Sequence, residues 1–301
     1  MATAGQFTAR ETGWPGSEER ATGRVTLHPV HFARTFAMQR LGQHDPTAEL
    51  VGDCFRKAFF YRGQAAAVEI CRDGDGLAVT AFGSGAQRLL EETLAGFAQE
   101  DRYSDFPTED TGVLRLYRSL PGLRLLRFPW LYETACSMIL QQRVRTVDAM
   151  RDWRRLTFRY GTAAPLGLRA FPAPPVLARV PLFALEQMGI DPRRAKTLLR
   201  LAHEMAFLRL DGGLELAELR ERLKKVPGIG PWTTESVMGY GAGDADAAIP
   251  GDLHLPRIIC YALAGEMDGT DARMMELLEP FRGHRFRIIR LLYAAGLDLP
   301  W

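Results

Sequence analysis

A glycine-rich turn and a carboxylate that follows it are the residues whose types and spacing could do chemistry. The turn has the sequence Val-Pro-Gly-Ile-Gly-Pro at residues 226–231. Gly228 and Gly230 accept positive φ at no steric cost, and Pro231 suits the first position of a helix. The backbone N–H groups at this point would converge at a helix N-terminus and form a site for an anion such as a phosphate. The turn alone leaves an ordinary connection between two helices as the alternative.

Asp252 is the carboxylate, 22 residues after Gly230 and directly after Pro250-Gly251. A fixed carboxylate stabilises positive charge that develops on a sugar, and it can orient or deprotonate a water molecule. Its structural alternative is a helix N-cap, because a predicted helix follows it. The two roles are compatible, since a helix N-terminus favours negative charge. We expect Asp252 to serve both.

The chain has 301 residues, a net charge of +2 and 47% hydrophobic residues, enough for one large or two ordinary domains with a buried core. Residues 1–115 carry 12 Lys or Arg against 16 Asp or Glu, and residues 116–301 carry 26 against 20. Positive charge is therefore concentrated in the part that holds the turn, as expected for contact with phosphates. Solvated helix faces would explain the same modest excess.

The sequence predicts a cytoplasmic protein without a membrane segment. No apolar run approaches the ~20 residues of a membrane span. The first 23 residues are polar, lack the apolar centre of a signal peptide and predict a mobile tail. The four cysteines, Cys54, Cys71, Cys136 and Cys260, form no C-x-x-C pair, which argues against zinc and iron–sulfur sites. Cys136 and Cys260 lie in apolar runs and are expected to be buried thiols.

The predicted fold class is α+β, with a disordered tail (1–23), an N-terminal α/β domain (24–115) and an all-helical domain (116–301). In the N-terminal domain, short apolar runs and turn signals predict a small antiparallel sheet backed by helices. The predicted strands are 24–30, 55–61, 65–71 and 77–82, and a helix is predicted at 86–100. From residue 116 onward the apolar residues recur at the spacing of an α-helix. The predicted helices lie at about 131–140, 147–160, 182–188, 192–206, 214–225, 255–263, 271–278 and 284–295.

The order of the motifs resembles the helix–hairpin–helix DNA glycosylase superfamily, and within it the bacterial 3-methyladenine DNA glycosylase II branch. The resemblance covers about residues 127–265. It rests on four matching pieces: Ile139-Leu140-Gln141-Gln142, Met188-Gly189 with Arg194-Ala195-Lys196, the turn continued through Trp232 and Thr233, and Ile249-Pro250-Gly251-Asp252. Each piece is weak by itself, but their common order is specific.

The resemblance implies that Asp252 is the catalytic carboxylate and that the hairpin grips the DNA backbone. It also implies a monovalent cation, Na⁺ or K⁺, on backbone carbonyls of the hairpin at Val226 and Ile229, with no other cofactor and no iron–sulfur cluster. Trp232 occupies the position where bifunctional relatives carry a Schiff-base lysine, so the chain resembles the monofunctional members. Arg143 stands where the branch usually places an apolar wedge, and a guanidinium plane can stack on bases in its place.

Further residues are candidates for contact with DNA, each with a structural alternative. Gln142 could reach the DNA or merely end a helix, and the charges at Arg282 and His284 could bind phosphate or face solvent. Aromatic side chains could stack on an extruded base or belong to the core. The predicted DNA-binding residues are Gly228, Ile229, Gly230, Trp232, Thr233, Lys224, Lys225, Gln142, Arg143, Arg282 and His284. The predicted base pocket comprises Trp130, Tyr132, Trp232 and Tyr240.

These expectations combine into a monofunctional DNA glycosylase that acts on alkylated purines in damaged double-stranded DNA, as a monomer. Such an enzyme must rotate the nucleotide out of the duplex before its glycosidic bond can be cleaved. Cleavage passes through an oxocarbenium-like sugar, and because an alkylated purine already carries positive charge, one aspartate suffices. Two alternatives stay open: a non-catalytic DNA-binding module, and a glycosylase for deaminated or oxidised bases.

Overall fold

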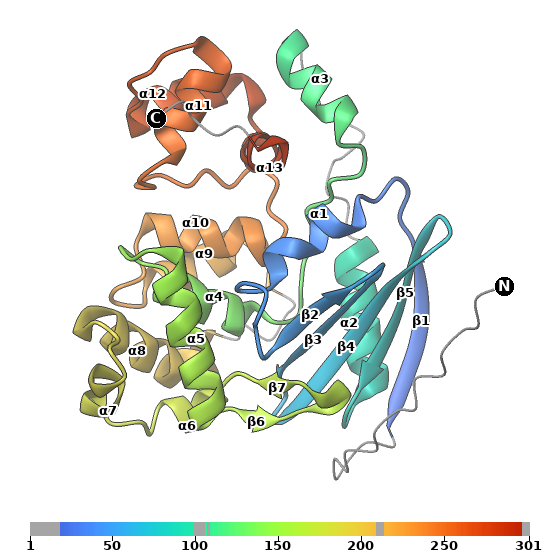
Figure 1. Ribbon diagram of the computed structural model, residues 1–301, viewed down its shortest axis with the longest axis vertical. Coiled ribbons are helices and arrows are strands. Elements are labelled where there is room, and N and C mark those ends of the chain that lie inside the picture. The colour runs from blue at the N-terminus through green and yellow to red at the C-terminus, as the bar shows by residue number, and fades with distance from the viewer. Residues whose placement is uncertain (1–18, 99–105, 107–108, 209–213, 297–301) are drawn as a thin grey trace, which may run out of the picture.

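The computed structural model describes residues 19–98, 106, 109–208 and 214–296. A five-stranded antiparallel sheet lies beside a larger helical part (Figure 1). The predicted α+β class is confirmed, because the chain forms an N-terminal antiparallel sheet followed by helices. No helix in these ranges is both long and apolar enough to cross a bilayer.

The sheet has the strand order β1-β5-β4-β3-β2, and all neighbours are antiparallel. Arg62 and Gly63 join β3 to β4 with positive φ at both positions, as a two-residue hairpin turn requires. The five strands are β1 (Arg20–Thr26), β2 (Ala48–Val51), β3 (Cys54–Tyr61), β4 (Gln64–Asp73) and β5 (Gly76–Phe82).

The two faces of the sheet are buried in different ways. On one face, large apolar side chains of β3 such as Phe55 and Phe59 pack with helix α2 (Ala86–Ala98), and α1 (Phe32–Phe36) joins them. On the other face, alanines of β3 and β4 meet a short hairpin, β6 (Thr162–Ala163) and β7 (Arg169–Ala170). Small side chains allow this hairpin of the helical part to approach the sheet closely.

Several details differ from the sequence prediction. The first strand spans Arg20–Thr26 instead of 24–30, so residues 20–23 belong to the sheet and not to a tail. The rest of the predicted tail, residues 1–18, lies outside the described residues. Strand β2 and the β6–β7 hairpin were not predicted, because both are too short to show a period. Cys54 and Cys71 face each other across β3 and β4 and form a disulfide, while Cys136 and Cys260 are buried free thiols as predicted.

The helical part surrounds a second core that is separate from the core of the sheet. Most predicted helices are present with ends shifted by one or two residues. The helices of this helical part are α3 (Thr111–Ser119), α4 (Leu131–Leu140), α5 (Thr146–Tyr160), α6 (Pro174–Leu177), α7 (Leu182–Gln187), α8 (Pro192–Leu208), α9 (Leu216–Lys224), α10 (Pro231–Tyr240), α11 (Leu255–Ala264), α12 (Asp271–Leu278) and α13 (Arg285–Ala295).

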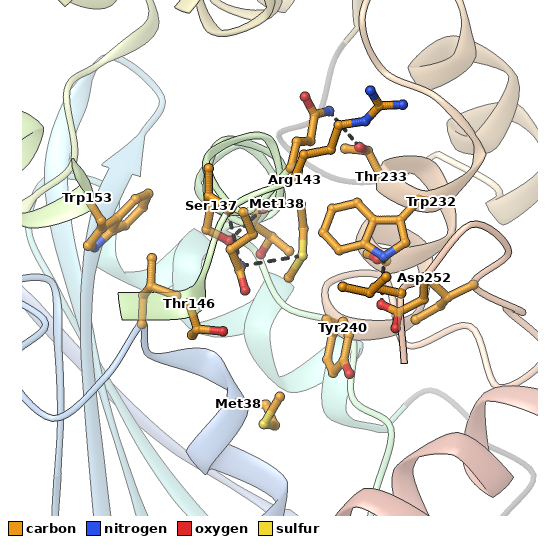
Figure 2. A pocket seen from close by; sticks show the side chains of 18 of the residues that line it. Met38, Ser137, Met138, Arg143, Thr146, Trp153, Trp232, Thr233, Tyr240 and Asp252 are labelled. Carbon is orange, nitrogen blue, oxygen red and sulfur yellow. Dashed lines mark hydrogen bonds between the residues drawn. The ribbon is translucent and has the colours of Figure 1, made fainter. Parts of the chain in front are cut away.

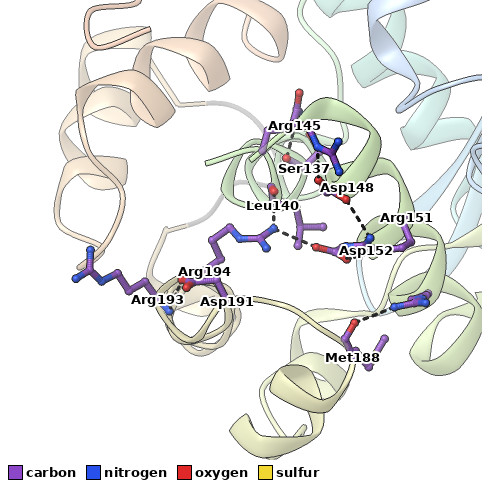
Figure 3. Close-up of polar contacts among 12 residues, drawn as sticks. Ser137, Leu140, Arg145, Asp148, Arg151, Asp152, Met188, Asp191, Arg193 and Arg194 are labelled. Carbon is purple, nitrogen blue, oxygen red and sulfur yellow. Dashed lines mark hydrogen bonds and ion pairs between the residues drawn. The ribbon is translucent and has the colours of Figure 1, made fainter. Parts of the chain in front are cut away.

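Helix α4 is fixed at both of its ends. At its start, the Glu133 carboxylate accepts the Phe60 N–H of β3 at 2.8 Å. At its end, the Arg194 guanidinium of α8 donates to the Leu140 carbonyl at 2.8 Å and forms a buried ion pair with Asp152 of α5 at 3.1 Å (Figure 3). These contacts fix the position of the end of α4, and therefore of the loop that follows it beside the α9–α10 turn.

Candidate active site

A groove of about 2150 Å³ is lined by residues of α4, α10 and the start of α11, and the N-terminal part contributes the 3₁₀ turn Ala37–Gln39 to its lining. We call two parts of it the catalytic end and the inner end. The catalytic end comprises Trp232, Tyr240, Asp252 and Tyr293. The inner end comprises Asp45, Lys57, Glu133 and Trp153. Figure 2 shows Trp232, Tyr240 and Asp252 together at one side of the groove and Trp153 at the other.

The hairpin between α9 and α10 has the predicted form, with one correction. Gly228 has a φ of +102°, and a Cβ there would lie 2.1 Å from the Thr197 hydroxyl oxygen, so both conformation and space require glycine. Gly230 has a φ of −96° and is extended, so the positive φ expected for it is wrong. Pro231 opens α10 as predicted. The first N–H groups of α10 have no partner within the helix and point out of its N-terminus beside the groove.

Asp252 is held by three hydrogen bonds. Its Oδ1 accepts the N–H groups of His254 and Leu255, both at 2.9 Å, and its Oδ2 accepts the indole N–H of Trp232 at 2.9 Å. The residue directly before α11 is His254, which makes no side-chain cap, and Asp252 makes the predicted capping bonds from two residues further back. A carboxylate offers about four acceptor positions. Asp252 therefore keeps one for a sugar or a water molecule in the groove.

Two tyrosines complete the catalytic end. Tyr240, predicted for the base pocket, lines the groove, and its ring meets the edge of Phe286 at 5.0 Å. Tyr293 on α13 was not predicted, because the helical period of residues 284–295 does not reveal which face meets another element. Burial, followed by the charge of Asp252, raises the pKa of the Tyr293 hydroxyl. Burial likewise raises the pKa of Tyr240.

Two predicted site residues belong to the interior and not to the groove surface. Tyr132 is 4% exposed, and its hydroxyl donates to the Pro172 carbonyl at 3.2 Å. His284 is fully buried, so the predicted phosphate contact is wrong. In both cases the side chain serves the core, which was the structural alternative.

Trp130 borders the groove but is only 1% exposed, and its ring stacks on Phe128 at 4.7 Å. Its place in a base pocket stays a prediction.

Of the remaining predicted DNA contacts, Ile229 and Thr233 are buried at 5% and 2% exposure, and the others lie around the hairpin or beyond it, exposed or partly exposed. The Gln142 amide donates to the Gly228 carbonyl at 3.0 Å and to the Thr233 hydroxyl at 2.8 Å, which ties the loop after α4 to the hairpin. Arg143 has a φ of +54° and is exposed at the rim of the groove (Figure 2). Lys224 and Arg282 are exposed and pair with acidic neighbours on their own helical turns. Lys225 is also exposed.

The predicted cation site concerns two carbonyls of the hairpin. The Val226 carbonyl accepts the Ile229 N–H at 3.0 Å, which closes the turn. A carbonyl oxygen has two lone pairs, so one remains on Val226 for a cation. The cation site at Val226 and Ile229 stays a prediction.

The inner end is a set of buried polar groups that the sequence did not reveal. Asp45 accepts four hydrogen bonds: from the Trp153 indole at 2.9 Å, from the Leu41 N–H at 2.7 Å, and from the Thr47 N–H and hydroxyl at 2.8 and 2.7 Å. The Lys57 ammonium donates to the Thr47 hydroxyl at 2.7 Å and lies 5.6 Å from the centre of the Trp153 ring. Burial lowers the pKa of Lys57 and raises that of Glu133 to about 7.

Comparisons with known proteins agree with this architecture. Residues 136–282 match the family described as "HhH-GPD superfamily base excision DNA repair protein". The chain is 27% identical over 270 residues to a "Probable N-glycosylase/DNA lyase" of Methanothermobacter thermautotrophicus, covering 79% of this chain and 85% of that protein. It is also 27% identical over 223 residues to "DNA-3-methyladenine glycosylase 2" of Escherichia coli K12, covering 71% and 75%. The solved 3-methyladenine DNA glycosylase of Archaeoglobus fulgidus shares the fold with a TM-score of 0.71 at 21% identity, over 92% of this chain and all of that one.

Proposed function

We propose that this chain, which belongs to the HhH-GPD superfamily of base excision DNA repair proteins through residues 136–282, hydrolyses the N-glycosidic bond of alkylated purines in duplex DNA. The observation that carries the proposal is the position of Asp252. Its carboxylate lies in the wall of the groove, held at 2.9 Å by Trp232, a residue of the hairpin helix α10. A phosphate bound at the start of α10 would bring the attached sugar to this carboxylate.

Binding begins at the hairpin in this mechanism. The N–H groups at the start of α10 hold a phosphate, and the helix dipole adds to their attraction. Arg143 at the rim of the groove is placed to enter the gap that an extruded nucleotide leaves in the duplex. Extrusion costs a few kcal/mol, and a damaged base lowers that cost because it pairs poorly.

The catalytic end then receives the extruded base and sugar. The rings of Trp232 and Tyr240 line the groove beside Asp252, and aromatic faces attract cationic groups such as an alkylated purine. As the bond from C1′ to the base breaks, the sugar acquires positive charge, and the Asp252 carboxylate stabilises it. A water molecule on the remaining acceptor position of Asp252 adds to C1′ and loses a proton.

A bifunctional activity is the second candidate, because one relative bears the name "Probable N-glycosylase/DNA lyase". A lyase of this kind needs an amine next to C1′. In this chain an indole, Trp232, occupies the position of the Schiff-base lysine and is bonded to Asp252. This observation favours the monofunctional reaction.

The test is a panel of duplexes that carry 3-methyladenine, 7-methylguanine, hypoxanthine, uracil or 8-oxoguanine, with release of each base measured directly. We expect release of the alkylated purines and no DNA adduct trapped by borohydride. A trapped adduct would establish the lyase reaction instead. If no base leaves any duplex while the protein binds DNA, the chain is a binding module.

A further inference from the structure

We propose that Tyr240 is a second catalytic residue, which donates a hydrogen bond from its hydroxyl to the departing base, and that Arg290 positions it. This inference rests on the proposed glycosylase function and extends its substrates to purines that are neutral, such as deaminated ones. The single carboxylate of Asp252 assists the sugar but does nothing for the charge that a neutral base acquires when it leaves.

Tyr240 is held in the groove by one contact to its backbone and one to its ring. It lies on α10 eight residues after Trp232, on the face that lines the groove beside Asp252 (Figure 2). The Gln39 amide of the N-terminal domain donates to the Tyr240 carbonyl at 2.8 Å. Phe286 packs edge-on against the ring at 5.0 Å. The phenol is therefore held in one place, as a preorganised hydrogen-bond donor must be.

Arg290 of α13 is a buried charge that nothing in the proposed mechanism has yet used. It is 5% exposed, and within the described ranges no carboxylate lies at ion-pair distance from it. Its guanidinium donates to the Arg34 carbonyl at 2.9 Å and lies 5.7 Å from the centre of the Tyr240 ring. A buried, unpaired guanidinium is costly, so its retention against a groove-lining phenol indicates a role there.

The chemistry of these two side chains leaves the phenol proton free of Arg290. A guanidinium has five N–H donors and no acceptor, so Arg290, 5.7 Å from the centre of the Tyr240 ring, can only donate toward the Tyr240 oxygen. The proton of the phenol is consequently available for another acceptor. Burial raises the pKa of Tyr240, which keeps that proton in place at neutral pH, while the nearby Arg290 charge acts in the opposite sense and makes the hydroxyl a stronger donor.

The reaction balances without a further reagent. The bond from C1′ to the base nitrogen breaks, and its electron pair goes to the base. An alkylated purine becomes neutral in this step, whereas hypoxanthine becomes an anion whose charge the Tyr240 hydroxyl stabilises through a hydrogen bond. Water adds to C1′ and gives up a proton, and the departed anion takes a proton from solvent while Tyr240 keeps its own.

The test compares two leaving groups in single-turnover experiments on the full chain. Tyr240→Phe should slow the release of hypoxanthine by about 100-fold, the usual effect of removing one such donor, and the release of 7-methylguanine by less than about threefold. Arg290→Lys retains the charge and should give a smaller loss, again on hypoxanthine alone. Tyr160→Phe is the matched control, because this tyrosine ends α5 and does not line the groove, and it should leave both rates unchanged. Thermal unfolding and fluorescence anisotropy with DNA check that each variant is folded and binds.

Each outcome decides between the claims. A selective loss on hypoxanthine supports the inference, since a merely structural defect would slow both bases alike. Equal slowing of both, an unchanged hypoxanthine rate, or a wild-type protein that releases 7-methylguanine but never hypoxanthine overturns the role of Tyr240 and leaves the proposed function standing. No release of either base from any duplex overturns the proposed function itself.

Discussion

The two ends of the groove hold carboxylates in opposite situations. At the inner end, Asp45 accepts four hydrogen bonds, three of them on Oδ1, and is only 6% exposed. At the catalytic end, Asp252 accepts three and is partly exposed. A buried carboxylate surrounded by donors of its own chain is a structural group, and a partly exposed one in the wall of a groove can take part in a reaction.

The inner end joins the sheet part of the chain to the helical part. Asp45 and Lys57 belong to the N-terminal part, while Trp153 and Glu133 belong to helices of the second part. The bond from Trp153 to Asp45 ties α5 to the segment before β2, and the bond from the Phe60 N–H to Glu133 ties α4 to β3. The catalytic end depends on this framework for its position, yet its own residues come mostly from the helical part.

The largest effect is expected at the catalytic end. Asp252→Asn keeps an amide oxygen for the N–H groups of His254 and Leu255, so the turn before α11 should survive. The variant loses the negative charge beside the sugar, and base release should fall about 10³-fold, which is ~4 kcal/mol in the barrier. Single-turnover release and DNA binding are the measurements. Release at the wild-type rate would show that Asp252, like Asp45, has only a structural role, and would contradict the contrast between the two ends.

The converse effect is expected at the inner end. Asp45→Ala leaves the buried donors of Trp153, Thr47 and Leu41 without an acceptor and should reduce the free energy of unfolding by about 4 kcal/mol. Urea unfolding measures the loss, with the exposed Asp53→Ala as the control. The folded fraction should release bases at the normal rate. A stable Asp45→Ala protein that cannot release bases would assign Asp45 to catalysis.

The same contrast marks what the sequence could predict. The hairpin was predictable because its backbone conformation demands glycine at 228, and Asp252 was predictable from its place directly after Pro250-Gly251. Tyr132 was placed wrongly because an aromatic at the start of a helix suits a base pocket and a core equally well. Tyr293 and the inner end could not be predicted from the sequence, because their positions depend on which faces of distant elements pack together. A local sequence pattern is enough to predict a turn. The groove depends on how the sheet part and the helical part pack together, which no local pattern reveals.

The pH dependence of stability should separate the inner end further. The pKa of Glu133 rises from 4.5 to about 7 on burial, so the folded protein binds a proton that the unfolded chain releases at a lower pH. Stability is therefore lost as pH rises from about 4.5 to about 7, by at most roughly 3 kcal/mol. Glu133→Gln does not titrate, so its stability relative to wild type should increase over this range. Melting temperatures between pH 5 and 8 test this, with exposed Glu91→Gln as the control; parallel profiles would contradict it.

The smallest effect concerns the link between the hairpin and the wall of the groove. Gln142→Ala removes the hydrogen bonds to the Gly228 carbonyl and the Thr233 hydroxyl. Because this amide is partly exposed, water can replace it, and the loss should be about 1 kcal/mol, or fivefold in DNA affinity. Gln141→Ala is the matched control, since that amide bonds only within its own helix, to Ser137 and Met138. Equal DNA affinity of the two variants in anisotropy titrations would show that the hairpin keeps its shape without Gln142. A weaker Gln142→Ala would show that the catalytic end, unlike the inner end, is held by contacts that solvent and DNA can reach.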